Sequence, residues 1–219
     1  MLADAFAPEE LEGAAKLAAG LREGADPRVL VTVAVGPGGE VLGGIVGEIY
    51  EPERVLLLAY LAVRPPLRGK GIGAALVRHA AARWFAGPSV CLALAEVHDP
   101  RRWPAGAGEE PLARLRLFAR LGARVLGVPF VQPALQPGGA RSRGFLLLAF
   151  HVDPSVEARA AVPADVVGRF VRRYYATAEG AGEPYDRELA CLLYTIDERP
   201  TIPLLPVSEY DRVPLPPAR

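Results

Sequence analysis

The chain has 219 residues, of which 51% are apolar and 23% charged, and this composition indicates a folded protein and argues against a disordered one. Lys plus Arg and Asp plus Glu both number 25, so the formal net charge is zero and no global field attracts a polyanion. Net charge therefore gives no reason to expect a nucleic acid or an anionic membrane as a partner.

Cysteine usage and hydropathy exclude several further classes. Cys91 lies in an apolar strand-like run and Cys191 in a helical one, with no CxxC spacing, which argues against a disulfide framework or a zinc site. The longest apolar run, residues 55–63, is too short to span a bilayer, and the N-terminus lacks the basic region of a signal peptide. We expect a soluble, cytoplasmic protein with no membrane partner.

The first half of the chain alternates between one helix and several strands. Apolar residues at helical spacing predict a helix over residues 8–22. Three β-branched or aromatic runs at 28–35, 40–50 and 55–63 predict consecutive antiparallel strands, and the glycines of "GGEVLGG" are interpreted as turn residues. A glycine-rich loop and a helix over 72–85 follow.

The second half begins with a predicted strand at 90–97 and an unusually long loop at 98–111, interpreted as a lid or an interface element. A helix opens at Pro111 and stops at Gly122, and two strands are expected around 124–131 and 145–152. From residue 153 two helices are expected, then a proline-rich tail from Pro200 lying extended over the surface.

These elements predict an α/β fold, α+β by stricter definition: a mixed, mainly antiparallel central sheet flanked by helices. We assign residues 1–152 to this domain and residues 153–219 to a C-terminal helical and proline-rich extension.

The segment "LAVRPPLRGKGIGAALV", residues 61–77, carries the strongest functional signal. An extended run ends at Val63 and a helix begins near Gly71, so unpaired main-chain amides converge where the helix dipole is positive. Glycines at 69, 71 and 73 remove side chains that would keep a diphosphate from these amides, while Arg68 and Lys70 add positive charge. The segment therefore predicts an anion site.

Two other nucleotide motifs compete for this segment. A P-loop needs Ser or Thr after Gly-Lys, and here Gly71 follows Lys70, so that interpretation fails. The dinucleotide fingerprint G-x-G-x-x-A does match Gly69, Gly71 and Ala74, with Glu96 at a plausible distance for a ribose contact. Against it, "RPPLR" separates the strand from the glycines, and hairpin-linked strands precede the motif. It stays open as a weaker alternative.

The pattern Arg68-x-x-Gly71-x-Gly73, between a strand ending in "LAVRP" and a helix reading "AALVRHA", resembles motif A of the GNAT family of acyl-CoA N-acyltransferases. "LALAEV" and "PLARLRLFARLGARVL" resemble the strand, helix and strand that follow in the family. The resemblance covers about residues 8–152, is strongest at 54–126, and says nothing about residues 153–219.

The resemblance implies acetyl-CoA as co-substrate, and the spacing of the histidines separately predicts no metal site. The pyrophosphate of acetyl-CoA would lie on the segment formed by Arg68, Gly69, Lys70, Gly71, Ile72, Gly73 and Ala74, and its pantetheine arm would pair like an extra strand with Leu61, Ala62 and Val63. The acyl carbonyl would then lie in a splay between the strands at 55–63 and 90–97. The three histidines, His79, His98 and His151, show no metal-ligand spacing.

Attack by an amine on a thioester benefits from a base, because most ammonium groups are protonated at neutral pH. Glu96 is the first candidate, since "AEVHD" resembles the family segment "LEVR", whose glutamate often acts as the base; a strand-end salt bridge is the competing interpretation. His98 is the second candidate, and Asp99 lies beside it.

The usual acid of the family is in doubt. Phe118 stands where members often have a tyrosine, and a phenyl ring has no proton to give. Tyr174, Tyr175 or Tyr185 could reach the site only if the C-terminal segment folds over it, and we interpret them as packing residues.

The favoured function is therefore transfer of an acetyl group from acetyl-CoA to a primary amine by direct attack. A non-catalytic acyl-CoA-binding or regulatory module is the alternative, and a dinucleotide-binding protein a weaker one. No sequence pattern indicates which amine is the acceptor. The C-terminal region could dock on its own core or mediate a homodimer.

Overall fold

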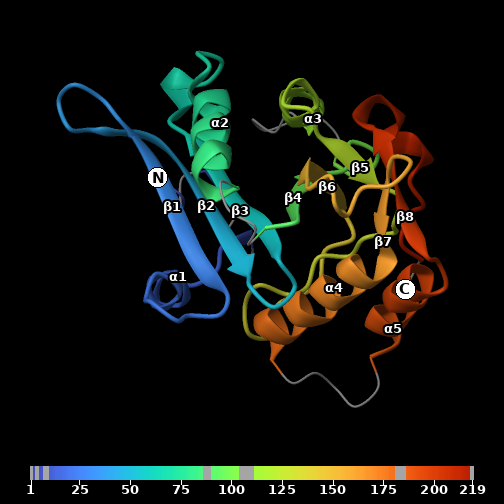
Figure 1. The fold of residues 1–219 in the computed structure, drawn as a ribbon. Helices are drawn as coiled ribbons and strands as arrows, with labels where there is room; N and C mark the ends of the chain where they lie inside the picture. The colour runs from blue at the N-terminus through green and yellow to red at the C-terminus, as the bar shows by residue number, and fades with distance from the viewer. Residues whose placement is uncertain are drawn as a thin grey trace. The chain divides into compact units, whose positions relative to one another are not determined.

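The computed structural model describes residues 2, 5–6, 10–85, 90–103, 111–180 and 186–217. The chain forms two compact units, Met1–Val90 and Cys91–Arg219, shown as a ribbon in Figure 1. The second unit contains the strands between residues 91 and 152 together with the helices and strands that follow residue 152. Within the described residues, no helix combines the length and the apolar character that crossing a membrane requires.

The first unit is built on a three-stranded antiparallel sheet in the order β1-β2-β3, which confirms the three expected strands. Its elements are α1 (Ala14–Gly20), β1 (Arg28–Val35), β2 (Val41–Tyr50), β3 (Val55–Val63), a 3-10 turn over Pro65–Leu67 and α2 (Ile72–Trp84). The first helix is shorter than the expected 8–22, and Pro8, which was expected to open it, lies outside the described residues.

Helix α2 packs closely on β2 because two strand positions lack side chains. A Cβ at Gly47 would lie 2.8 Å from the Trp84 ring, and one at Gly43 would lie 3.3 Å from a Leu76 methyl group. The expectation that "GGEVLGG" is only turn chemistry was therefore wrong for its last two glycines, which belong to β2. Glycine in a strand marks a close approach of another element, here the helix that carries the predicted anion site.

The second unit is a five-stranded sheet in the order β4-β6-β5-β8-β7, with each neighbouring pair antiparallel. Its strands are β4 (Leu92–His98), β5 (Arg124–Leu126), β6 (Phe145–Val152), β7 (Ala161–Pro163) and β8 (Thr201–Pro206). Its helices are α3 (Pro111–Arg120), α4 (Ala164–Glu179), α5 (Arg187–Asp197) and a 3-10 segment, Val207–Arg212. The mixed α+β class with mainly antiparallel sheets flanked by helices is as expected.

The proline-rich tail is part of this sheet, so the expectation that it lies over the surface was wrong. Residues 204–206 of β8 pair with Arg124–Leu126 of β5, and Ile202 and Leu204 are buried. The strand tolerates its prolines because their carbonyls still pair: Gly127 N donates to Pro203 O at 2.9 Å. Strand β5, expected over 124–131, ends at Leu126.

Two arginines fasten loops of the second unit. Arg101 pairs with the buried Asp99 and donates through Nη1 to the main-chain oxygens of Asp211 and Val213, at 2.9 Å each. Arg141 donates to Glu179 and Asp186 at 2.8 Å, which joins the 132–144 loop to the end of α4 and the start of α5. The residues after 152 are thus held to the strands by charge-assisted bonds as well as by the sheet.

Candidate active site

The loop before α2 presents a run of main-chain N–H groups. Arg68 N donates to Pro65 O at 3.2 Å and Ala75 N to Gly71 O at 2.9 Å. Between these two, the amides of residues 69–74 donate no hydrogen bond to any described part of the chain. They precede or open a 13-residue helix, where the positive end of the dipole favours an anion.

The glycines of this loop fit a bound diphosphate. Gly69 and Gly71 have φ of +75° and +84°, a conformation that residues with a Cβ rarely adopt, and a Cβ at either would face open space. Gly73 needs neither this conformation nor close packing, because a Cβ there would make ordinary contacts with Val63 at 3.7 Å and Leu61 at 4.0 Å. A side chain at this position would lie beside the end of β3.

Strand β3 ends at Val63, just before two prolines that cannot donate main-chain hydrogen bonds to a neighbouring strand. Arg64 N still donates to Leu42 O of β2, and Pro65, Pro66 and Leu67 then form the 3-10 turn. Arg68 is exposed and its Nε donates to Val63 O at 3.3 Å, while Lys70 is also exposed. Both cations therefore lie at the rim of the loop.

The residues expected to pair with pantetheine lie at the end of β3. Leu61, Ala62 and Val63 pair with Ile45, Gly44 and Gly43 of β2. The register shifts just before them, between Val46 and Gly47, so that Ala59 of β3 has no opposite residue. Such a bulge changes the direction of the strand at that point.

Glu96, on β4, accepts two hydrogen bonds on the same carboxylate oxygen. Tyr174 Oη of α4 donates to Oε2 at 3.1 Å, and Gln132 Nε2 donates to it at 2.8 Å. Both donors come from residues far along the chain and are buried, Tyr174 being 3% exposed and Gln132 7%. The sequence reasoning considered Tyr174 only as a packing residue and missed Gln132, which no local pattern marks.

The backbone of Gln132 is held by an isolated β-bridge to Ser142, with N···O distances of 2.8 and 3.1 Å. Next to it, Tyr175 Oη donates to the main-chain oxygen of Val131 at 2.7 Å. Oε2 of Glu96 is therefore held by two donors, so the carboxylate is not a fully solvated strand-end charge.

His98, the second base candidate, lies in an aromatic stack. The residue is 2% exposed. Its ring stacks on that of Trp103 with centroids 4.2 Å apart, and its centroid lies 4.7 Å from that of the Phe145 ring. Arg114 of α3 approaches its Nδ1 at 3.4 Å. Its neighbour Asp99 is engaged by Arg101.

Phe118, which replaces the usual tyrosine, is buried on α3 with its ring 6.3 Å from that of Phe150. Residues 104–110 of the expected lid at 98–111 lie outside the described residues, as does Tyr185.

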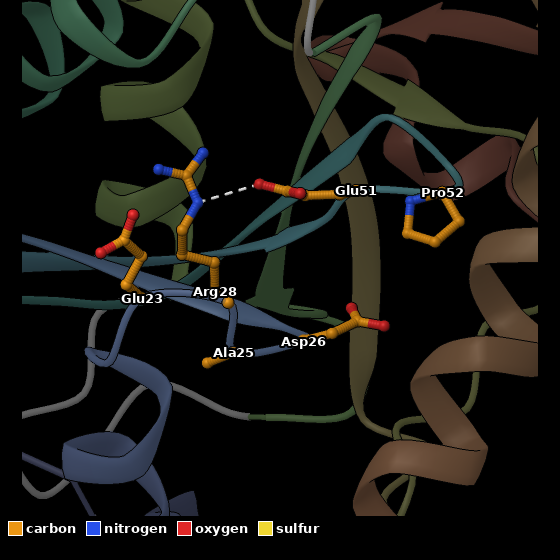
Figure 2. Close-up of a pocket in the computed structure, with 7 residues that line it drawn as sticks. Glu23, Ala25, Asp26, Arg28, Glu51 and Pro52 are labelled. Atoms are coloured by element: carbon orange, nitrogen blue, oxygen red, sulfur yellow. Dashed lines mark hydrogen bonds and ion pairs between the residues drawn. The ribbon is translucent and has the colours of Figure 1, made fainter.

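The first unit also contains a surface pocket. It is lined by Glu23, Gly24, Ala25, Asp26, Arg28, Glu51 and Pro52, and Figure 2 shows Arg28 Nε paired with Glu51 at 3.0 Å. None of the predicted site residues lines it. Three of its four charged lining residues are acidic, which disfavours an anion such as a nucleotide phosphate.

A second group that the sequence did not reveal is a pair of buried carboxyls in the first unit, Glu12 and Glu48. Glu48, on β2, is 2% exposed and accepts from Tyr50 Oη at 3.0 Å, while Glu12 pairs with Lys16. Burial first, and then the charge of Glu12, raises the pKa of Glu48 to about 8. Glu48 is therefore protonated at neutral pH and can donate to Glu12.

Comparisons with known proteins agree with this picture. Residues 2–102 match the model of the acetyltransferase (GNAT) family, and no curated protein matches the chain. A structure described as an acetyltransferase of the GNAT family, from Bacteroides thetaiotaomicron, superposes with a TM-score of 0.58 at 17% identity, over 83% of this chain and 89% of that one. The ribosomal-protein-S18-alanine N-acetyltransferase of Escherichia coli gives 0.44 at 17% identity, over 64% and 77%.

The chain has the GNAT acetyltransferase fold, and residues 2–102 match the GNAT family model, in agreement with the resemblance found in the sequence. This fold excludes the dinucleotide-binding alternative, because the strands before the glycine loop form antiparallel hairpins instead of a βαβ unit. The model that residues 2–102 match describes acetyltransferases, so the match agrees with acyl transfer as the expected class of reaction. Among the described residues, no cluster of three or more His, Cys, Asp or Glu could hold a metal ion.

Proposed function

We propose that this protein is an N-acetyltransferase that moves the acetyl group of acetyl-CoA to a primary amine. The observation that carries the proposal is the run of amides at residues 69–74, which find no acceptor among the described residues and open a helix in a chain that has the GNAT fold. Arg68 and Lys70 would add charge at the diphosphate. The main chain of Leu61, Ala62 and Val63 would pair with the pantetheine amides.

Glu96 is the proposed base. Its carboxylate takes a proton from the acceptor ammonium, directly or through a water molecule, and the freed nitrogen attacks the thioester carbonyl carbon. A C–N bond forms, the C–S bond breaks, and the electron pair leaves with the sulfur as a thiolate. The nitrogen then loses its extra proton to the thiolate, which gives the amide and the free thiol of coenzyme A. Because a thiol has a pKa near 8.5, this leaving group departs without an obligatory acid, so Phe118 does not prevent the reaction.

Calorimetry with acetyl-CoA tests the cofactor part of the proposal. We expect a saturable heat, and a higher melting temperature with acetyl-CoA but not with NAD(H). The absence of binding at millimolar acetyl-CoA would end the proposal.

Release of free thiol across a panel of primary amines separates an enzyme from a non-catalytic acyl-CoA-binding module. Binding of acetyl-CoA without turnover on any amine would favour the module.

Gly73→Ala is expected to weaken acetyl-CoA binding about ten-fold without harming the fold. The added methyl makes only ordinary contacts with Val63 and Leu61, and alanine is favoured over glycine in a helix by up to about 1 kcal/mol, so the melting temperature should stay or rise. The same methyl would stand over the amides that receive the diphosphate.

Gly13→Ala is the matched control for this change. Gly13 caps α1 with an ordinary φ of −59° and open space around it, so the substitution resembles Gly73→Ala at a helix start with no proposed ligand. Acetyl-CoA affinity should not change in this control. Unaltered affinity in Gly73→Ala would show that the diphosphate does not lie on these amides.

A further inference from the structure

We propose that Tyr174, on α4, is a positioning residue for Glu96, so that the region after residue 152 forms part of the catalytic machinery. This inference rests on the proposed function, in which Glu96 is the base. Helix α4 lies outside residues 2–102, the part of the chain that matches the family model. The contribution therefore belongs to this chain's own C-terminal region.

The contact that carries the inference is the 3.1 Å hydrogen bond from Tyr174 Oη to Glu96 Oε2. Gln132 Nε2 reaches the same oxygen at 2.8 Å, so two neutral donors fix the orientation of one carboxylate. A hydrogen bond to a charged acceptor is roughly twice as strong as one between neutral groups. Each donor also stabilises the ionised carboxylate, which is the form that a base needs.

Packing holds the Tyr174 ring before any substrate binds. The ring is 3% exposed and stacks on Phe170, one helical turn earlier, with centroids 5.6 Å apart and an interplanar angle of 16°. Val167 and Val171 of the same helix are fully buried. The hydroxyl is therefore supplied by a rigid element, which suits a group that must keep a carboxylate in a productive geometry.

Tyr175, the next residue on α4, is a buried tyrosine whose hydroxyl has a main-chain acceptor instead of a carboxylate. Tyr175 satisfies its hydroxyl on the main-chain oxygen of Val131 at 2.7 Å. Tyr174 instead points to Glu96, and His98, two residues further along β4 and in contact with Arg114 of α3, is the nearest other titratable group on that strand. The pairing of Tyr174 with Glu96 makes the proton affinity of the base depend on α4.

The experiment follows the Glu96 carboxyl by NMR in the full-length protein labelled with 13C at the glutamate carboxyls, with its signal identified by its loss in Glu96→Gln. In Tyr174→Phe the titration midpoint of Glu96 should move to higher pH by about one unit, because one donor to the ionised form is gone. Gln132→Met, which removes the other donor at similar volume, should move it in the same direction.

Tyr175→Phe is the control, because it removes a buried hydroxyl of the same helix and leaves both donors on Glu96 in place. Its Glu96 midpoint should match that of the unmodified protein. A midpoint that stays in place in both Tyr174→Phe and Gln132→Met, or that moves equally in Tyr175→Phe, would overturn the inference. Melting temperatures identify any variant that fails to fold. If one of Tyr174→Phe and Gln132→Met does not fold, the Glu96 midpoint of the other still tests the inference.

Kinetics add a double-mutant cycle with acetyl-CoA and the best amine of the panel. Tyr174→Phe should lower kcat roughly ten-fold to a hundred-fold with little change in the KM for acetyl-CoA, and should cost nothing further in a Glu96→Gln background. An equal loss in both backgrounds would also overturn the inference. If the unmodified protein turns over no amine, the proposed function fails, whereas the NMR titration still decides whether Tyr174 controls Glu96.

Discussion

Glu96→Gln is expected to lower turnover by about a hundred-fold to ten-thousand-fold while acetyl-CoA affinity stays within a factor of two or so, the range that loss of a general base produces. The amide keeps the size of the side chain and can still accept from Tyr174, whose donor lies 3.1 Å away. It cannot take a proton from the acceptor. Thiol release measured with saturating amine, together with calorimetry on acetyl-CoA, checks both halves of the expectation.

His98→Phe is the companion variant. A phenyl ring preserves the stack between Trp103 and Phe145 and removes both ring nitrogens, so the variant should fold and keep turnover if Glu96 is the base. An active Glu96→Gln protein would contradict the assignment. Loss of turnover in His98→Phe at unchanged melting temperature would then transfer the role of base to His98.

Glu48→Gln is expected to be more stable than the unmodified protein at pH 8, by an amount on the order of a few kcal/mol, and similar to it at pH 4.5. The folded protein holds Glu48 protonated up to its pKa of about 8, whereas the unfolded chain ionises this group near 4.5. Between these values the folded state binds more protons, so the contribution of Glu48 to stability is full below about 4.5 and is lost as the pH rises through 8.

The physical reason is that ionised Glu48 would stand beside Glu12 with little water. Glutamine at this position does not titrate and can still donate to Glu12 and accept from Tyr50. Urea unfolding of both proteins across pH 4.5 to 8.5 should give a difference that grows with pH and then levels off. Glu198→Gln, at the exposed end of α5, controls for the change in net charge. If the free energies of unfolding of the unmodified and Glu48→Gln proteins changed in parallel with pH, the raised pKa of Glu48 would be contradicted.

Local patterns were sufficient for the parts of the molecule whose interactions are close in sequence. The alternation of apolar residues predicted β1, β2 and β3. The order of strand, double proline, glycines and helix predicted the loop in which the amides of residues 69–74 donate to no acceptor in the described part of the chain. Helices α2, α4 and α5 were expected for the same reason, since a face repeating every three to four residues is visible in any segment long enough to bury it.

The features missed by sequence reasoning depend on contacts between distant segments. Strand β7 has only three residues and β8 contains prolines, so neither shows the alternation of apolar and polar residues that marks a strand. The tail enters the sheet because β8 pairs with the free edge of β5. Tyr174 and Gln132 lie 78 and 36 positions from Glu96 in the chain, and no periodicity connects them.

The sequence by itself was sufficient to predict the fold class and the position of the glycine loop before α2, because these follow from local hydrogen-bonding needs and hydrophobic spacing. Tertiary structure alone decided the surroundings of Glu96 and the protonation of Glu48, because the charge state of a buried carboxyl depends on which donors and which second carboxyl the packed chain brings to it.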